Sequence, residues 1–354
     1  VHENDPVWTP PLLMERKQAF SPKDNAFIRR AQVRFWLARR DGRDVGRISA
    51  QIDPLAPRGE DGPIGHFGCL SAADDPDIFA ALLGAAEDFL KSRGIGRVCG
   101  PFTLSINEET GLLIDGFERP PMLLMGHDPA YAARRLEALG YRKEKDVYAY
   151  LLDAQAPLSR TARAMLGRRP AASVRMRRLD FSDYSGEIRR MVDIYNDAWS
   201  GNWGFVPITE READEMAARM RMLLDERLVW FAEVDGKAVA FIVVLPNVNE
   251  AIQDLDGHLF PFGWAKLLWR LKVAGVRSAR VPLMGVRQSL AGTMIGSAIP
   301  LQLIGAVLPA SAAFRFRWVE LSWILEDNLR MRRILERLGA CAYKTYRVYG
   351  KTLG

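Results

Sequence analysis

Several side chains in this sequence could transfer protons. The segment WVELSWILE, residues 318–326, alternates apolar and polar residues in the manner of a β-strand. Because side chains of a strand point alternately to its two faces, one face is predicted to hold Glu320, Ser322, Ile324 and Glu326. Glu320 is therefore a candidate base that acts directly or through water. The alternative is a structural ion pair with an arginine such as Arg287.

A second polar group lies in an irregular stretch rich in Gly and Pro, between about 106 and 129. Glu108 stands near its start and His127 near its end, and both are candidate catalytic residues. Asn107 and Glu109 are candidate substrate contacts. Since neighbouring side chains of an extended chain point apart, at most one of the two carboxylates faces a given site. Alternatively, these residues hydrogen-bond an ordered loop together.

The elements that must position these residues fall into two parts. In the first, strands over 32–39 and 45–52 flank the turn DGRD, a helix covers 78–92, and RVCGPF reads as a strand. A helix over 130–139 and a strand over 146–152 follow. We expect an N-terminal domain over 1–152, truncated at its start because the chain opens on Val1 without a targeting pattern. Residues 153–172, rich in Ala, Pro and Arg, are predicted to be a linker.

The second domain is predicted over 173–354. Its elements are a strand over 174–179, helices over 185–199 and 209–224, a hairpin over 228–245, a strand over 280–286, a long uncharged helix, a strand over 318–325, a helix over 329–338 and a strand over 343–349. Both parts end in a helix closed by Leu-Gly and an aromatic strand: RRLEALGYRKEKDVYAY (134–150) and RRILERLGACAYKTYRVY (332–349). This repetition predicts a duplicated α/β fold, in which mixed sheets are flanked by helices. The alternative is coincidence, because a helix that ends at Gly and is followed by a strand is common in proteins.

The second part resembles the GNAT superfamily of N-acyltransferases. ELSWILEDNLRMRRILERLG looks like its strand–Asn–helix segment, which implies that Asn328 contacts the pantetheine or phosphate arm of the donor. The whole chain also resembles a bacterial family of tandem GNAT-like proteins, related to bacterial ceramide synthases. That resemblance is carried by GPFTLSINEETGLLIDGFERPPMLLMGH, YNDAWSGNWGFVP, HLFPFGWAKLLW and ELSWILEDN. It implies two tandem GNAT-like domains that transfer a fatty acyl group from a coenzyme A or carrier-protein thioester to a sphingoid base.

The resemblance further implies a donor site after the strand over 280–286. The superfamily motif there is Arg/Gln-x-x-Gly-x-Gly/Ala, whose backbone N–H groups bind a pyrophosphate. This chain reads AGTMIG over 291–296, so that only Gly292, Thr293 and Gly296 remain to shape an anion site. Backbone N–H groups near Val286 are expected to hold the reaction's oxyanion. The corresponding loop of the first part, CLSAADDPD, is acidic, and we expect it to bind no nucleotide.

The same resemblance makes the strand over 318–326 central in its sheet. A carboxylate with both faces of the strand covered is costly unless it is paired or used, which favours Glu320 as base for the amine. The tyrosine that often protonates the leaving thiolate in the superfamily is Leu335 here. Tyr343 and Tyr346 on the last strand are alternative hydroxyl donors, or packing residues.

The loop YNDAWSGNWGFVP, residues 195–207, joins the first two helices of the second part, where the superfamily shapes its acceptor pocket. Four of its side chains could form a polar-edged aromatic wall for an amino-alcohol head above an alkyl chain: Asn196, Trp199, Asn202 and Trp203. Packing between the helices is the alternative.

Two apolar segments bear on membranes. HLFPFGWAKLLWRLK (258–272) places Trp264, Leu267, Leu268 and Leu271 on one helical face, with Lys266 and Arg270 on the other. We expect peripheral contact with the inner leaflet over about 259–272, with core cover as the alternative. Residues 288–314 carry no charge, but they contain two prolines and are predicted to form a buried helix with a lipid-facing or acyl-chain-facing continuation.

Composition limits the remaining classes. The 354 residues are 26% charged and 48% hydrophobic, which excludes disordered, collagen-like and polytopic membrane proteins. The three cysteines are far apart, so that no disulfide framework or metal site is predicted and a cytoplasmic setting is favoured. A net charge of +6 favours anionic partners, but no basic run with interleaved aromatics indicates nucleic acid. Alternatives are a GNAT enzyme for a small amine or protein, and a non-catalytic lipid- or protein-binding module.

Overall fold

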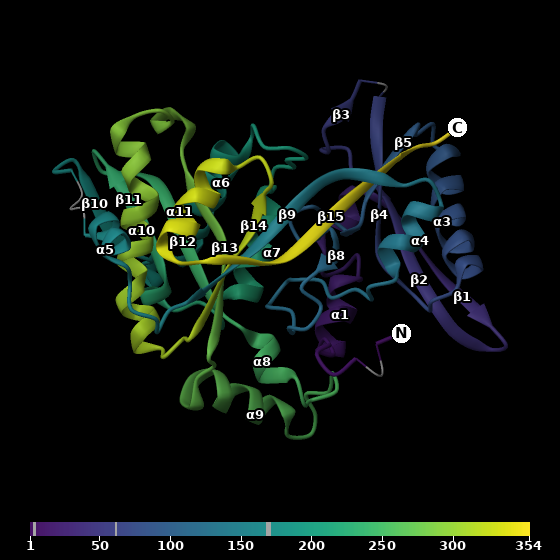
Figure 1. Ribbon diagram of the computed structural model, residues 1–354, viewed down its shortest axis with the longest axis horizontal. Helices are drawn as coiled ribbons and strands as arrows, with labels where there is room; N and C mark the ends of the chain where they lie inside the picture. Colours follow the sequence, from purple (N-terminus) through teal and green to yellow (C-terminus); the bar gives the residue numbers. More distant parts are fainter. Residues whose placement is uncertain (3–4, 61, 168–170) are drawn as a thin grey trace.

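One large mixed sheet joins strands from both parts of the sequence (Figure 1). The computed structural model describes residues 1–2, 5–60, 62–167 and 171–354. The strand order is β1-β2-β4-β5-β15-β9-β14-β13-β12-β11-β10. The first part contributes α1 (Leu13–Ala19), α2 (Ala26–Arg30), β1 (Gln32–Arg40), β2 (Arg43–Ile52), β3 (Arg58–Gly59), β4 (Gly62–Ala72), α3 (Pro76–Lys91), β5 (Arg97–Gly100), β6 (Phe102–Thr103), β7 (Glu109–Thr110), β8 (Leu112–Asp115), α4 (Ala132–Ala138) and β9 (Arg142–Asp153).

The second part follows after α5 (Arg160–Leu166). Its elements are β10 (Val174–Arg178), α6 (Tyr184–Trp199), α7 (Glu210–Met220), β11 (Val229–Val234), β12 (Lys237–Pro246), α8 (Val248–Ile252), α9 (Gly263–Trp269), β13 (Ser278–Val286), α10 (Met294–Ala313), β14 (Trp318–Leu325), α11 (Leu329–Leu338) and β15 (Cys341–Thr352). Within the predicted linker, α5 buries Ala162 and packs against α10 and α11, whereas residues 168–170 lie outside the described residues.

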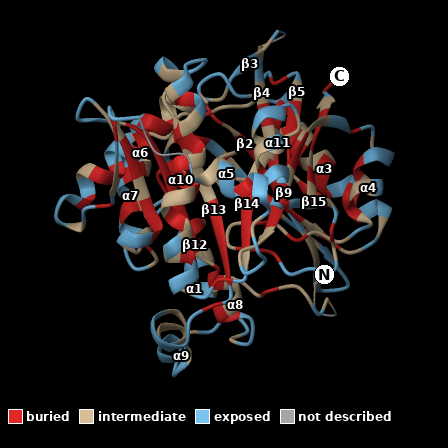
Figure 2. Cartoon of the chain, turned by 60° about the vertical axis from the view of Figure 1, so that its left-hand side comes forward, coloured by how far each residue is buried: buried red, intermediate tan, exposed pale blue. Residues whose placement is uncertain are grey.

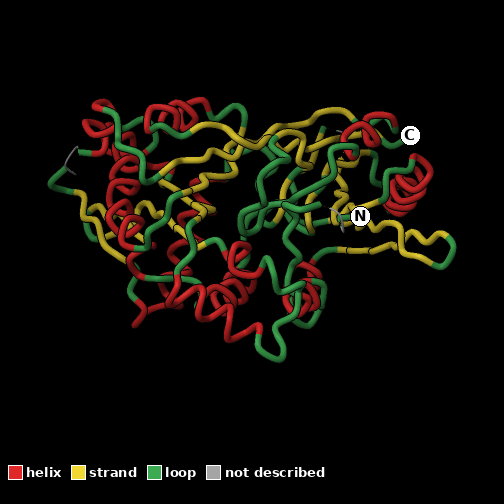
Figure 3. Tube along the Cα trace, turned by 60° about the horizontal axis from the view of Figure 1, so that its bottom comes forward, coloured by secondary structure: helices red, strands yellow, loops and turns green. Residues whose placement is uncertain are grey.

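Local sequence accounts for both predicted hairpins. β1 pairs with β2 and β11 with β12, each antiparallel. Asp41 and Gly42 connect the first pair, Asp235 and Gly236 the second, and all four residues have positive φ. Two consecutive residues of positive φ match the twist of a β-hairpin, which is why Asp-Gly stands there. The β1–β2 hairpin projects from one end of the molecule (Figure 3).

The two parts exchange their last strands. β15 inserts between β5 and β9, with Tyr349 opposite Gly100 and Gly350 opposite Arg142. β9 in turn pairs with β14, with Leu321 opposite Tyr150. Figure 1 shows β9 and β15 running together through the centre of the molecule. Each part of the sheet is therefore completed by a strand from the other part of the sequence.

Each part contains a parallel strand pair connected by a helix. β4 and β5 flank α3, and β13 and β14 flank α10. The pairing of β13 with β14 ends at Val281 and Leu321, yet β13 stays paired with β12 up to Val286 and β14 with β9 up to Leu325. The two strands therefore separate towards their carboxyl ends.

Helices cover the sheet over three main clusters. α3 and α4 cover the first part, while α6 and α7 cover one face of the second. α10 packs with α5, α11 and the strands β11 to β13, and Figure 2 shows much of it buried. In the described part of the chain, α10 is the one helix long and apolar enough to span a membrane. The predicted helix over the uncharged run is present and is buried in part, since Ile299 and Leu303 are 0% exposed whereas Met294 is 90% exposed. Its lipid-facing or acyl-chain-facing continuation stays a prediction.

The segment after α8 projects from the molecule and ends in α9 (Figures 1 and 2). The predicted apolar face is wrong in part, because Leu267 and Leu271 pack against the core cluster of the second part. The exposed apolar side chains belong instead to a set that we call the α9 patch: Phe260, Phe262, Trp264, Trp269 and Val273. Phe260 and Phe262 precede α9, so their exposure could not be predicted from the helical period of the segment.

Candidate active site

The strand exchange brings Glu320 into a fully buried polar cluster. Glu320 is 0% exposed, and Arg280 on β13 is 1% exposed. Ser322 Oγ donates to Glu320 Oε1 at 2.6 Å, and Arg280 Nε lies 3.4 Å from that oxygen. The Tyr343 hydroxyl, from β15, donates to Glu320 Oε2. The cluster therefore needs side chains from three strands, β13, β14 and β15, the last of which is separated from β14 by β9.

Arg280 also fixes the loop that covers the cluster. Its Nε donates to Ser322 Oγ at 2.8 Å, and its NH1 group donates to the carbonyl of Leu123 at 2.7 Å. The guanidinium lies 4.6 Å from the ring centre of Trp323. The arginine of the alternative ion pair is therefore Arg280 and not Arg287, which pairs with Asp193 at the surface. Arg280 was not among the residues predicted from the sequence, and the signal that could have found it is a charged residue inside the apolar strand β13.

The alternation predicted for the strand over 318–326 holds only as far as Ser322. A register shift between Leu321 and Ile324 sends Ile324 to the opposite side, where it packs in the cluster around α10. Trp323 and Leu325 instead join the cluster beneath Tyr343. The prediction that Ile324 shares the face of Glu320 is therefore wrong, because a bulge reverses the side-chain alternation.

Burial changes the proton affinities around Glu320. Burial, reinforced by the charge of Glu320, raises the pKa of Tyr343 well above its usual range. The pKa of Arg280 is lowered by burial, with Glu320 acting in the opposite direction. Burial also lowers the pKa of Lys344 to about 8, although its Nζ donates to the carbonyls of Gly116 and Arg119. Tyr343 therefore stays a hydroxyl donor at neutral pH.

A cavity of about 360 Å³ lies beside Tyr343. Its wall combines the loop 119–122 of the first part with α8 and the beginnings of β13 and β14. Thr9 from the N-terminal segment also lines it. No described residue of the loop 195–207 contributes to this wall. A ligand in the cavity would lie next to the tyrosine that is hydrogen-bonded to Glu320.

His127 forms a pair with the N-terminal segment. Its Nε2 lies 2.8 Å from Asp5 Oδ2, and its Nδ1 is buried without a hydrogen-bond partner among the described residues. Burial lowers the pKa of His127, against the opposing effect of Asp5. The neighbouring Tyr346 is fully buried, and its hydroxyl donates to the carbonyl of Gly126.

The residues predicted around 107–109 connect the two parts of the chain. The Asn107 amide donates to the carbonyl of Val206, and the Tyr195 hydroxyl donates to Asn107 Oδ1 at 2.6 Å. Glu109 accepts from Thr103 and lies 3.6 Å from Arg16. Burial raises the pKa of Glu108 to about 7. Glu108 thus combines a near-neutral pKa with a position at the junction.

The predicted acceptor wall is engaged in contacts of its own. The Asn196 side chain donates from Nδ2 to the carbonyl of Ile208 and accepts at Oδ1 from the Ile208 N–H. These two hydrogen bonds close the loop. Trp199 packs against Tyr195, with ring centres 4.9 Å apart. Trp203 packs beside Val348 in a small cluster, and Asn202 is exposed.

The predicted donor residues lie beyond the carboxyl ends of β13 and β14. Val286 ends β13, and Thr293 caps α10 by accepting from the N–H of Gly296 at 3.0 Å. Gly292 has a φ of +77°. A Cβ at Gly296 would lie 2.1 Å from the carbonyl oxygen of Leu290, which explains this glycine. Asn328 caps α11 by accepting from Met331 N–H.

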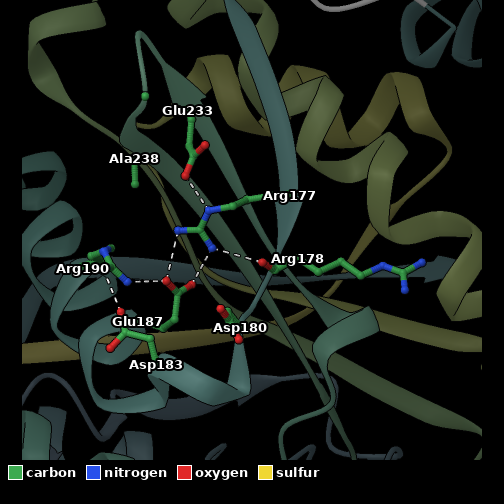
Figure 4. A pocket seen from close by; sticks show the side chains of 9 residues that line it. Arg177, Arg178, Asp180, Asp183, Glu187, Arg190, Glu233 and Ala238 are labelled. Atoms are coloured by element: carbon green, nitrogen blue, oxygen red, sulfur yellow. Dashed lines mark hydrogen bonds and ion pairs between the residues drawn. The ribbon is translucent and has the colours of Figure 1, made fainter.

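A polar pocket of about 330 Å³ lies where β10 meets α6 (Figure 4). There, Arg177 bonds both Glu187 and Glu233, and Arg190 also pairs with Glu187. These ion pairs compensate the charge of the buried Glu187 carboxylate. They therefore hold β10 against α6. In the described residues, no group of three or more metal-binding side chains is present.

Comparison with known proteins decides the family. No family model matches the chain. It is 50% identical over 354 residues to a bacterial ceramide synthase of Caulobacter vibrioides (strain NA1000 / CB15N), covering all of this chain and 92% of that protein. The chain belongs to the bacterial ceramide synthase family. Protein YghO of Escherichia coli (strain K12) is 45% identical over 353 residues, which are 100% of this chain and 90% of that protein.

Solved structures show the same tandem fold. A tandem GNAT protein from the clavulanic acid biosynthesis pathway matches with a TM-score of 0.53 and 15% identity, over 92% of this chain and 84% of that one. A GCN5-related N-acetyltransferase from Sphaerobacter thermophilus matches with a TM-score of 0.50 and 14% identity, over 88% and 83%. The predicted α/β class and the GNAT relationship are confirmed. This member of the bacterial ceramide synthase family is an acyltransferase, and its fold is that of enzymes that use acyl thioesters.

Proposed function

We propose that this enzyme transfers a fatty acyl group from a thioester to the amine of a sphingoid base. The amine nitrogen attacks the thioester carbonyl, the C–N bond forms, and the thiolate leaves as the C–S bond breaks. The name of the Caulobacter relative supports the substrate class, and the cavity beside Tyr343 carries the proposal. Six apolar or aromatic residues form one part of its wall and eight polar or charged residues the rest, which suits a reactant with both an alkyl chain and a polar head.

Glu320 and Tyr343 are the proposed proton acceptors. An amine in the cavity can give its proton to the Tyr343 oxygen while Tyr343 gives its own proton to Glu320, along the hydrogen bond between them. The charge of Arg280 stabilises Glu320 before the transfer. Glu108 and His127 are the alternative bases, the first because burial brings its pKa to about 7.

Donor binding is assigned to the separated ends of β13 and β14. Gly292, Thr293, Gly296 and Asn328 would hold the phosphate and pantetheine of a coenzyme A or carrier-protein donor at the start of α10. Backbone N–H groups near Val286 would stabilise the oxyanion. Trp323 Nε1 is buried without a partner among the described residues and offers a further donor. The second domain, 173–354, would thus carry the donor and the first domain, 1–152, would cover the acceptor.

Removing the carboxylate tests this assignment. Glu320→Gln should form amide from a sphingoid base and acyl-CoA about 100-fold more slowly, since a positioned base contributes this order of rate. Tyr343→Phe should lose rate similarly, whereas Glu326→Gln, on the same strand but paired with Lys143, serves as control. Turnover of Glu320→Gln at the wild-type rate and with the wild-type pH profile would make the cluster structural. Glu108→Gln and His127→Gln would then identify the base.

The α9 patch supports peripheral contact with the cytoplasmic membrane, into which a long-chain amine would partition. Phe260 and Phe262 are 76% and 79% exposed, and aromatic residues favour the interface of a bilayer. Lys266 and Arg270 pair with Asp254, so the local positive charge is partly neutralised. We therefore expect apolar burial to dominate this binding, with a weak dependence on salt.

Vesicle flotation tests the membrane contact. The wild-type enzyme should float with anionic vesicles, and Phe260→Glu combined with Phe262→Glu should remain behind. Leu37→Glu, on the exposed β1–β2 hairpin, is the matched control. Failure of the wild-type protein to float at low salt would refute the membrane contact, whatever its activity.

A further inference from the structure

Part of the wall of the cavity beside Tyr343 is suited to contact a hydrocarbon chain. Six of its lining residues present mainly carbon to the interior: Pro120, Pro121, Met122, Leu151, Trp318 and Tyr343. Met122 and Leu151 are buried. A volume of about 360 Å³ is in the range of pockets that enclose small organic ligands.

Two polar side chains of the wall, Asn249 and Glu250, are hydrogen-bonded within the protein, and the cavity is also lined by Arg119 and Arg277. The Glu250 carboxylate accepts from the backbone N–H groups of Arg277 and Ser278 and from Ser278 Oγ, the last at 2.6 Å. The Asn249 amide donates to the carbonyls of Pro121 and Met122. Because Asn249 and Glu250 already have partners, an apolar ligand can fill the cavity without leaving them unsatisfied.

The cavity and the donor residues lie at opposite ends of the same strand pair. Ser278 and Trp318, which begin β13 and β14 and pair with each other, line the cavity. Thr293 and Asn328 follow the other ends of these strands. Glu320 and Tyr343 therefore stand between the cavity and the place proposed for the thioester.

The rim of the cavity is linked to α9 by ion pairs. Gln253, exposed at the end of α8, lines the cavity. The next residue, Asp254, binds Lys266 and Arg270 and so attaches α9 beside this rim. An alkyl chain that leaves a bilayer at the α9 patch would meet the cavity next.

We propose that this cavity holds the alkyl chain of a lipid reactant and sets which chain lengths the enzyme accepts. The inference rests on the proposed function. The chain could belong to the amine or to the fatty acyl donor, because the wall recognises hydrocarbon and both reactants carry it. The head of that reactant then lies at Tyr343.

The test measures kcat/KM against chain length for two series of substrates, one varying the amine and one varying the acyl-CoA. Gln253→Trp narrows the rim at an exposed position, where the larger side chain displaces no core residue. Met122→Ala widens the wall. Lys237→Trp, at an exposed position of the β11–β12 hairpin, is the matched control.

In Gln253→Trp, kcat/KM for the longest chains of one series should fall about ten-fold relative to short chains, since a single methylene in an apolar pocket carries this order of discrimination. Met122→Ala should shift the optimum of the same series to longer chains. The series that responds, amine or acyl-CoA, identifies which reactant places its alkyl chain in the cavity. Unmoved profiles in both series, with an active wild-type enzyme, would overturn the cavity proposal alone. Absence of amide from every wild-type substrate pair would instead overturn the proposed function.

Discussion

The two strand–helix–strand units of the sheet share a geometry but differ in charge. In the first, Asp75 caps α3 by accepting from the N–H groups of Asp77 and Ile78, and it pairs with Arg40. In the second, the neutral Thr293 caps α10. The start of a helix attracts anions. In the first unit the Asp75 carboxylate already supplies a negative charge there, whereas in the second unit Thr293 supplies none. We therefore expect an anion to bind at the start of α10 and not at the start of α3.

The same contrast holds where the parallel strands pair. Arg280 stands opposite Glu320 on β13 and β14, whereas His66 stands opposite Cys99 on β4 and β5. Burial lowers the pKa of His66 to about 4 and raises that of Cys99, so both are neutral at pH 7. One unit therefore buries a charged pair with hydrogen-bond partners, and the other a neutral pair.

Substitutions in the exchanged strands β9 and β15 are expected to change the free energy of unfolding the most. Tyr349 of β15 packs in the core of the first part, and Tyr150 of β9 packs in the core of the second. Replacing either by alanine should destabilise the protein by about 3–5 kcal/mol. Because each tyrosine belongs in sequence to the other part, both variants should unfold in one calorimetric transition. Two separate transitions, with only one shifted by each variant, would contradict this coupling.

The helix caps give a smaller effect that separates the two units. Thr293→Ala and Asp75→Ala should each lower the free energy of unfolding by about 1 kcal/mol, the usual loss for a cap. Only Thr293→Ala should also raise the KM for acyl-CoA, measured with saturating amine. An equal rise in both variants would mean that the two units bind the donor alike.

A further prediction concerns the pH dependence that Glu108 confers at the junction. Its pKa is raised from 4.5 to about 7 in the folded protein, so the folded state keeps a proton that the unfolded state releases. This contribution to stability is therefore lost as pH rises from about 4.5 to 7. Glu108→Gln should flatten that decline in urea unfolding measured at pH 5 and pH 8, with the exposed Glu226→Gln as control. An unchanged slope would show that Glu108 titrates as an exposed carboxylate.

Short-range patterns were enough for many of the elements and for part of the site, but they missed β4 and the helices α1, α2 and α8. The Asp-Gly turns, the cap of α7 at Thr209 with Glu212, and the acidic start of α3 were all predictable because the interacting groups are a few residues apart. The burial of Glu320 could be predicted because a strand pattern and a family resemblance indicated a central strand.

What the sequence by itself determined is therefore local: the turns, the caps, the helix ends and the repetition of Leu-Gly before β9 and β15. Only the tertiary structure decided that Glu320 meets Arg280 and Tyr343, that the last strands are exchanged, and that Leu267 faces the core while Phe260 faces solvent. Those contacts join residues far apart along the chain. Their free energy depends on which surfaces are buried together, and no periodicity within a single segment contains that information.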